Sequence, residues 1–193
     1  MHQWFDMVSV QEPCFDPENI QFCGMRESVR FVHDIIEKAA AEVGGYDKVF
    51  LGGISQGCAT AILALLTVRQ RMAGFIGFSG WCPFTIALLN GASDHAGSKT
   101  AFARWVQEIQ LLSPNVLASL EVEVALQTPM LIEHAQDDHV VPLALGEDLR
   151  DNLDRLGVVV QWRKYADGAH WINEPQGIDD MVKFIEVKTI ERM

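Results

Sequence analysis

Residues 49–61 constrain the fold of this chain more than any other segment. They read Val-Phe-Leu-Gly-Gly-Ile-Ser-Gln-Gly-Cys-Ala-Thr-Ala, an apolar run that leads through Gly-x-Ser-x-Gly into small residues. Such a run is typical of a buried strand that turns sharply into a helix, and the glycines let the two elements approach closely. In that turn Ser55 is held in a strained conformation with its hydroxyl exposed. The segment predicts a candidate nucleophile; the simpler alternative is a glycine turn with an inert serine.

The length and composition indicate one compact domain over residues 1–193. With 49% hydrophobic residues, the chain can bury a sizeable core. The net charge of −11 disfavours a nucleic-acid partner, which needs a basic surface. No apolar run approaches the roughly 18 residues that span a bilayer, and residues 1–6 lack the regions of a signal peptide. We therefore expect a cytoplasmic protein without a transmembrane segment.

The cysteines favour neither a metal site nor a disulfide scaffold. Cys14, Cys23, Cys58 and Cys82 show no C-x-x-C spacing, and four cysteines are few for a chain of this length. We expect them to be reduced and mostly buried. No metal or organic cofactor is predicted.

The rest of the chain alternates between expected strands and helices, with no repeat or low-complexity tract. Strands rich in Val, Ile and Phe that alternate with helices imply an α/β fold with a mainly parallel sheet, covered on both faces. Strands are expected over residues 48–51, 74–79, 130–134 and 158–165, with a short strand end within 4–10. Helices are expected over residues 29–43, 58–68, 84–89, 102–112 and 178–192.

A serine nucleophile needs a base and an acid, and on this type of fold they follow the serine in the order acid, histidine. The polar loop at residues 135–142 follows a strand and offers Asp137 and Asp138, between which spacing alone does not decide. His170 lies in the polar loop after the last strand and is the candidate base. Catalytic groups of open α/β sheets gather at these carboxyl ends of strands.

The other histidines have simpler interpretations. His139 is expected to be a solvated loop residue, His134 a packed residue at a strand end, and His33 part of a helix. His2 and His95 have no context that supports a role.

Five segments in order carry a family resemblance. They are residues 4–6, 51–57, 78–83, 134–142 and 165–170, which span most of the chain. Together they resemble the phospholipase/carboxylesterase family that includes the acyl-protein thioesterases. The resemblance implies an α/β-hydrolase-like fold, with the residues that match Ser55 and His170 as nucleophile and base. It also implies Asp138 as the acid, four residues after the histidine that matches His134.

The resemblance implies hydrolysis of carboxylic esters or thioesters through an acyl-serine intermediate. The substrate would be a small-molecule or lipid acyl ester, or an acylated protein. The backbone N–H of Gln56 would donate to the oxyanion.

Apolar residues after Gly80 suggest a substrate surface, because in related enzymes this region helps cover an acyl channel. Trp81 and Phe84 are the candidates there, with Ile86, Leu88 and Leu89 beside them, and Trp171 adjoins the candidate base. The simpler alternative is that each of these side chains only packs the core or anchors a loop.

One departure separates this sequence from the family pattern. Family members have further strands ahead of the segment that matches residues 4–6, and the first ends in a loop that donates a second N–H to the oxyanion. We therefore expect an N-terminally shortened sheet whose elbow strand, the strand that leads into the turn at Ser55, has an open edge. A second subunit in a homodimer, a rearranged N-terminus or aggregation would cover that edge; an incomplete sequence would look the same. The alternative function is a non-catalytic binding or partner protein with an incomplete oxyanion hole.

A smaller departure is Cys58, where the family usually has glycine. A cysteine is small enough for the helix to stay against the strand, so we expect a buried thiol and not a second nucleophile.

Overall fold

The computed structural model describes residues 3–13, 15–16, 18–68, 70–89, 95–108 and 122–191. Strands and helices alternate along these residues, as the sequence predicts. The elements are α1 (Gln21–Val43), the 3₁₀ turn η1 (Tyr46–Lys48), β1 (Phe50–Ile54), α2 (Gln56–Thr67), β2 (Gly74–Phe78), α3 (Thr85–Leu89), α4 (His95–Glu108), α6 (Val122–Ala125), β3 (Met130–Ala135), α7 (Leu143–Arg155), β4 (Val160–Tyr165) and α8 (Gln176–Ile190).

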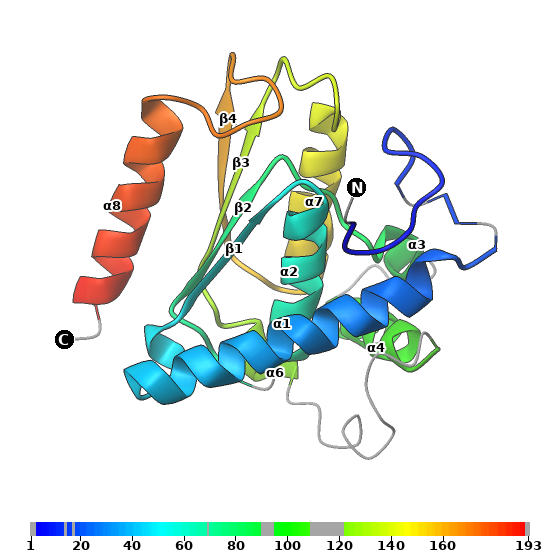
Figure 1. Ribbon diagram of the computed structural model, residues 1–193, viewed down its shortest axis with the longest axis horizontal. Coiled ribbons are helices and arrows are strands. Elements are labelled where there is room, and N and C mark those ends of the chain that lie inside the picture. The colour runs from blue at the N-terminus through cyan, green and yellow to red at the C-terminus, as the bar shows by residue number, and fades with distance from the viewer. Residues whose placement is uncertain are drawn as a thin grey trace.

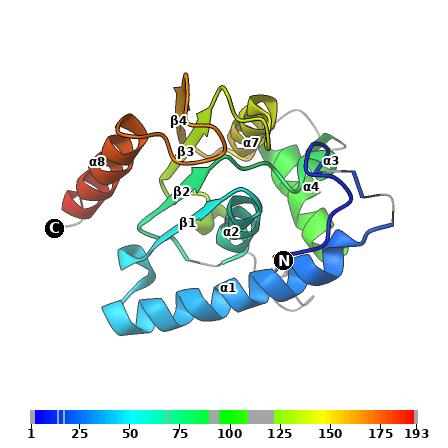
Figure 2. The same ribbon diagram turned by 45° about the horizontal axis from the view of Figure 1, so that its top comes forward.

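The four strands form one parallel sheet in the order β1-β2-β3-β4. Helix α8 covers one face, and α1, α2 and α7 lie on the other (Figures 1 and 2). The predicted α/β fold with a parallel sheet covered on both faces is confirmed. Within the described residues β1, the elbow strand, pairs only with β2 and is an edge of the sheet.

The larger part of the core lies on the α1/α2 face. Helix α2 is almost uniformly apolar and is buried from Cys58 to Thr67, because it lies between the sheet and α1. Helix α1 is amphipathic and buries one stripe at helical spacing, Met25, Val29, Val32, Ile36 and Ala40. It ends at Gly44, whose φ of 77° places it in the left-handed conformation typical of a helix C-terminus.

The α8 face carries a smaller apolar layer. Phe184 of α8 packs there against Ile76 and Phe78 of β2 and Leu131 of β3. Because α8 is the one described helix on this face and it contacts β2 and β3, the α8 face of β1 is less covered.

Three local predictions need correction. The segment at residues 4–10 is not a strand but a series of bends. Helix α1 begins at Gln21, eight residues earlier than expected, where the Asp16 carboxylate accepts the N–H groups of Ile20 and Gln21. Helix α4 likewise begins at His95, and residues 109–112 of the expected helix lie outside the described residues.

Helix α7 was not predicted, although the sequence contains its signals. Pro142 precedes it, and Leu149 and Leu153 recur at helical spacing and are buried. Its polar face hid the pattern, because most of the remaining positions are charged.

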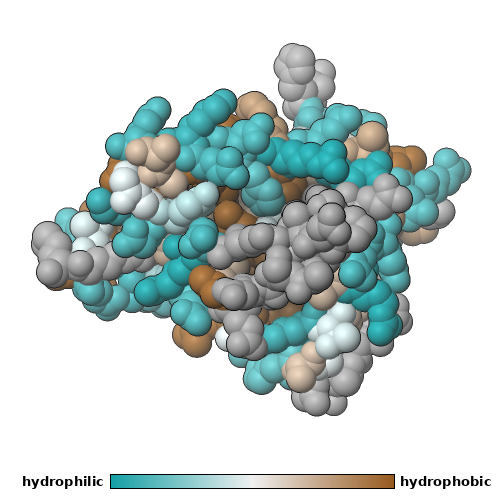
Figure 3. Space-filling view, turned by 90° about the horizontal axis from the view of Figure 1, so that it is seen from below, coloured by the Kyte–Doolittle hydropathy of each residue, from teal (hydrophilic) through white to brown (hydrophobic). Residues whose placement is uncertain are grey.

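One face of the molecule is mostly polar. Seen from below, hydrophilic side chains cover most of the coloured surface, and apolar ones form separate patches (Figure 3). None of the described helices is both long and apolar enough to cross a membrane.

Candidate active site

Ser55 lies in the sharp turn between β1 and α2. Its φ of 56° and ψ of −129° are a conformation that residues other than glycine rarely adopt. Its N–H donates to the carbonyl oxygen of Phe78 (3.0 Å), and its own carbonyl accepts the N–H of Cys58 (2.9 Å). A Cβ on Gly53 would lie 2.5 Å from the carbonyl oxygen of Gly57, so the turn requires glycine there. The strand-turn-helix context predicted from the sequence is present.

Asp138 lies in the loop after β3 and is buried. One carboxylate oxygen, Oδ1, accepts the N–H groups of Val140 and Val141, both at 2.9 Å. The other, Oδ2, is 2.9 Å from Nδ1 of His170. Burial alone would raise the pKa of this carboxyl, but the hydrogen bonds from His170, Val141 and Val140 outweigh it and hold the pKa below its ordinary value. Asp138 is therefore a fixed anion.

His134 contacts the carboxylate of Asp138. Its Nε2 lies 2.9 Å from the carbonyl oxygen of Val141 and 3.5 Å from Oδ2 of Asp138. Because a carbonyl oxygen only accepts, Nε2 carries the proton. Burial lowers the pKa of His134, so the ring is neutral near pH 7. His134 is the packed strand-end residue that the sequence predicts.

His170 lies in the loop after β4, with its ring partly exposed. The Asp138 carboxylate only accepts, so Nδ1 of His170 carries the shared proton and Nε2 is left free to take another. Spacing alone did not separate the two aspartates. In the structure Asp138 bonds the imidazole, whereas Asp137 accepts the backbone N–H of Ala169.

The topology brings these residues to the carboxyl-terminal end of the sheet. Ser55 follows β1, Asp138 follows β3 and His170 follows β4, and the strands are parallel. The strand ends are in register, with Ile54 opposite Phe78 and Ala135 opposite Tyr165. The carboxyl end of a parallel sheet is where polar loops converge into a site.

Gln56 has a side-chain role that the sequence did not reveal. Its Oε1 accepts the N–H of Trp4 (2.9 Å), and its Nε2 donates to the carbonyl oxygen of Phe5 (2.7 Å). The side-chain amide therefore holds residues 4 and 5 in place of a strand ladder. Its backbone begins helix α2, directly after Ser55.

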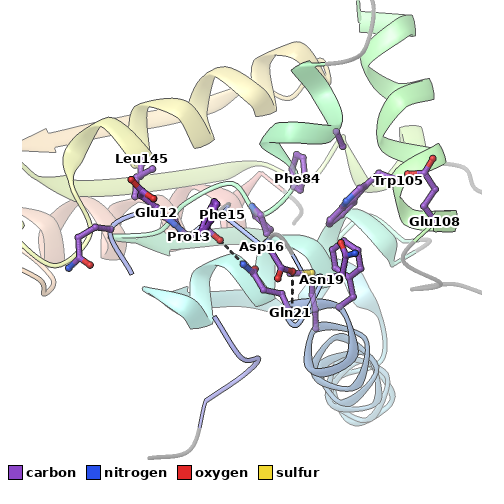
Figure 4. A pocket seen from close by; sticks show the side chains of 15 residues that line it. Glu12, Pro13, Phe15, Asp16, Asn19, Gln21, Phe84, Trp105, Glu108 and Leu145 are labelled. Atoms are coloured by element: carbon purple, nitrogen blue, oxygen red, sulfur yellow. Dashed lines mark hydrogen bonds between the residues drawn. The ribbon is translucent and has the colours of Figure 1, made fainter. Parts of the chain in front are cut away.

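A pocket of about 800 Å³ lies among the described residues (Figure 4). It lies between the N-terminal loop, the start of α1, and helices α3, α4 and α7. Its apolar walls include Phe22, Phe84, Trp105 and Leu145, and Glu12, Asp16 and Glu108 also line it. The candidate triad residues are not among its lining residues.

The predicted substrate-binding residues separate in the structure. Phe84 lines the large pocket and stacks edge-on with Phe102 of α4. Trp81 is 1% exposed and belongs to the core. Trp171 is 60% exposed and lines a shallow apolar hollow of about 280 Å³ on the α8 face of β1. Leu88 is buried, and the side chains of Ile86 and Leu89 lie outside the described residues.

The remaining described histidines and cysteines differ in exposure and in contacts. His139 is exposed, His33 contacts the Ala64 carbonyl oxygen, and His95 contacts that of Arg155. Of the three described cysteines, all of which are free, Cys58 and Cys82 are buried and Cys23 is exposed, in line with the expectation of mostly buried thiols; His2 and Cys14 lie outside the described residues. The described part of the chain holds no cluster of three potential metal ligands.

Cys58 is a fully buried thiol whose pKa is raised to about 12 by burial. Because the thiolate is the reactive form, this residue is not a nucleophile near pH 7.

The chain is similar in sequence to known proteins. The chain is 26% identical over 186 residues to carboxylesterase SOBER1 of Arabidopsis thaliana, covering 96% of this chain and 66% of that protein. It is 28% identical over 162 residues to acyl-protein thioesterase 1 of Gibberella zeae, covering 84% of this chain and 57% of the relative. The chain thus spans two thirds or less of the length of these relatives.

Solved structures show the same fold. The crystal structure of Arabidopsis thaliana SOBER1 superposes with a TM-score of 0.72 at 23% identity, covering 98% of this chain and 75% of that one. Zea mays acyl-protein thioesterase 2 gives 0.68 at 23% identity, with 96% and 72% covered. Residues 1–105, more than half of the sequence, match the Phospholipase/Carboxylesterase family. This chain belongs to the phospholipase/carboxylesterase family of α/β-hydrolases.

Proposed function

We propose that this protein hydrolyses carboxylic esters or thioesters through an acyl intermediate on Ser55. One observation carries the proposal. A strained turn places Ser55 at the carboxyl-terminal end of the sheet, the same end at which Nδ1 of His170 lies 2.9 Å from Oδ2 of Asp138. Membership in the family and the similarity to a carboxylesterase and an acyl-protein thioesterase support it.

In the proposed first half-reaction, Nε2 of His170 accepts the Ser55 hydroxyl proton as Oγ attacks the acyl carbon. Asp138 holds the ring in the required tautomer and stabilises the imidazolium that forms. The backbone N–H of Gln56 donates to the oxyanion of the tetrahedral intermediate. That intermediate then expels the alcohol or thiol, which takes the proton from His170.

In the second half-reaction a water molecule gives its proton to His170 and attacks the acyl carbon. The ester bond to Ser55 breaks, the serine regains its proton, and a carboxylic acid leaves. No step uses a metal or an organic cofactor.

We propose that the 800 Å³ pocket receives the acyl chain of the substrate. Several of its lining residues follow directly, along the chain, the segments that carry or contact the triad. Leu145 lies at the start of α7, just after the Asp138 loop, and Pro83 and Phe84 follow the end of β2. Glu12 and Pro13 follow the segment that Gln56 holds. Lipid esters, acylated proteins and small esters with an apolar acyl group are all substrates of this kind.

Hydrolysis of a p-nitrophenyl ester series from acetate to palmitate tests this proposal. We expect turnover that Ser55→Ala abolishes while the circular dichroism spectrum and melting temperature stay unchanged. Trp105→Ala should shift the chain-length optimum without removing activity on acetate. Equal hydrolysis by the wild type and the Ser55→Ala variant would contradict the proposed function.

A non-catalytic partner protein is the second candidate function. It is favoured by the open edge of β1, because the described residues provide no strand on that side of the nucleophile. Labelling with a fluorophosphonate separates the candidates: an activated serine reacts at Ser55, whereas an inert one leaves the protein unlabelled.

A further inference from the structure

We infer that Asp137 is a positioning residue, which holds the backbone that carries His170 in register with Asp138. This inference rests on the proposed function, in which His170 acts as the base. The two aspartates are adjacent in sequence, and their partners, Ala169 and His170, are adjacent too. One aspartate therefore fixes the backbone of the loop after β4, and the next fixes the imidazole ring.

The loop that carries His170 needs such a restraint. Gly168 has a φ of 134°, and Ala169 has a φ of 50°, which is unfavourable for a residue with a Cβ. Two successive residues with positive φ do not form a helix or strand, so interactions with other segments must hold their conformation.

Asp137 supplies one of these interactions from the loop after β3. Its Oδ1 accepts the N–H of Ala169 at 2.8 Å, a normal length for a hydrogen bond to a carboxylate. The bond joins two loops that are 32 residues apart in the chain. It acts on the peptide unit between Gly168 and Ala169, the two residues before His170, so it restrains the backbone that leads into His170.

The other restraints act elsewhere. Asn173 holds the far side of the same loop, because its Nδ2 donates to the carbonyl oxygen of Asp167 (2.9 Å) and its Oδ1 accepts the N–H of Gly177. Asp138 is held within its own loop by Val140 and Val141. The bond from Asp137 thus links the loop that carries Asp138 to the loop that carries His170, one residue from each of these two side chains.

Loss of this bond should lower kcat more than it changes KM, because it misaligns a proton acceptor and does not alter the substrate pocket. Asp137→Ala removes the acceptor and should reduce kcat about tenfold, as expected for one hydrogen bond worth about one factor of ten. Asp137→Asn keeps an acceptor oxygen of the same reach but removes the charge, so it should restore most of kcat. His139→Ala, a change at an exposed residue of the same loop, is the matched control.

A second measurement does not depend on turnover. In the wild type the shared Nδ1 proton of His170 should give a downfield ¹H NMR resonance, since it is bonded to Asp138. We expect that resonance to broaden or disappear in Asp137→Ala and to persist in Asp137→Asn and His139→Ala.

The outcomes distinguish the two proposals. If the wild type hydrolyses no ester but the resonance follows this pattern, the positioning role stands and the proposed function fails. If Asp137→Ala and Asp137→Asn lose kcat equally, the charge and not the acceptor matters, and the inference is wrong. It is also wrong if Asp137→Ala retains full kcat and a sharp resonance.

Discussion

The two halves of the candidate site are held by different forces. Around Ser55 the chain is held by close packing: Gly53 lies against Gly57, and Gly80 lies against Cys58 with no room for a Cβ. Around His170 it is held by polar groups, among them Asp138, His134 and Asp137. Changes of side-chain volume should therefore disturb the first half, whereas changes of charge or pH should disturb the second.

The largest effect is expected at Asp138. Asp138→Asn keeps the shape but favours the wrong tautomer of His170, so kcat should fall on the order of 10⁴-fold. Steady-state kinetics with a p-nitrophenyl ester measure this, with Asp151→Asn on the exposed face of α7 as the control. Loss of less than about tenfold would show that Asp138 does not orient the base.

The next effect concerns pH and the buried carboxyl group of Glu133, on the strand that leads to the Asp138 loop. Glu133 of β3 is buried, and burial together with repulsion from Asp180 raises its pKa from 4.5 to about 7. The unfolded chain then releases this proton at lower pH than the folded chain. The contribution of Glu133 to stability is therefore lost as pH rises from about 4.5 to about 7.

Glu133→Gln removes that titration. Urea unfolding should show the variant more stable than the wild type by on the order of 2–3 kcal/mol at pH 8, with little difference at pH 4.5. The pH slope of the wild type should flatten in the variant. An identical slope in both proteins would mean that Glu133 is not buried in the neutral form.

A volume change tests the packed half. A Cβ on Gly80 would lie 2.4 Å from Sγ and 2.7 Å from Cβ of Cys58, so Gly80→Ala should destabilise the fold by about 1–3 kcal/mol. Adding Cys58→Gly removes both clashing atoms. Thermal unfolding should show the double variant to be more stable than the sum of the single changes predicts. Simple additivity would contradict the contact.

The smallest effect is expected at Gln56. Gln56→Ala removes both side-chain bonds to residues 4 and 5 but leaves the backbone N–H after Ser55 intact. We expect faster amide hydrogen exchange at Trp4 and a loss of about 1 kcal/mol or less of global stability. Gln56→Glu, which keeps the acceptor for Trp4, should show intermediate exchange. Unchanged exchange at Trp4 in Gln56→Ala would show that other contacts hold the segment.

Local patterns explain why most of the fold was predictable. Strands β1 to β3 contain short apolar runs and β4 alternates in part, and the stripe of α1 and the glycine after it follow rules that act within a few residues. Helix α7 was missed because its apolar positions are few. The segment at residues 4–10 was misassigned because a side chain 52 residues away, and not a neighbouring strand, binds the N–H of Trp4.

The candidate site divides in the same way. The sequence by itself determined the serine turn, the polar loops after the strands and, through a family pattern, the choice of Asp138, because each depends on residues close together in the chain. Only the tertiary structure decided that His134 braces Asp138, that Asp137 holds the loop of His170, and that Trp81 is buried while Phe84 lines a pocket. The bond from Asp137 joins loops 32 residues apart, and its partner is set by the register of the parallel strands, which no local pattern encodes. The contact between His134 and Asp138 spans only four residues, but it depends on how the loop after β3 folds.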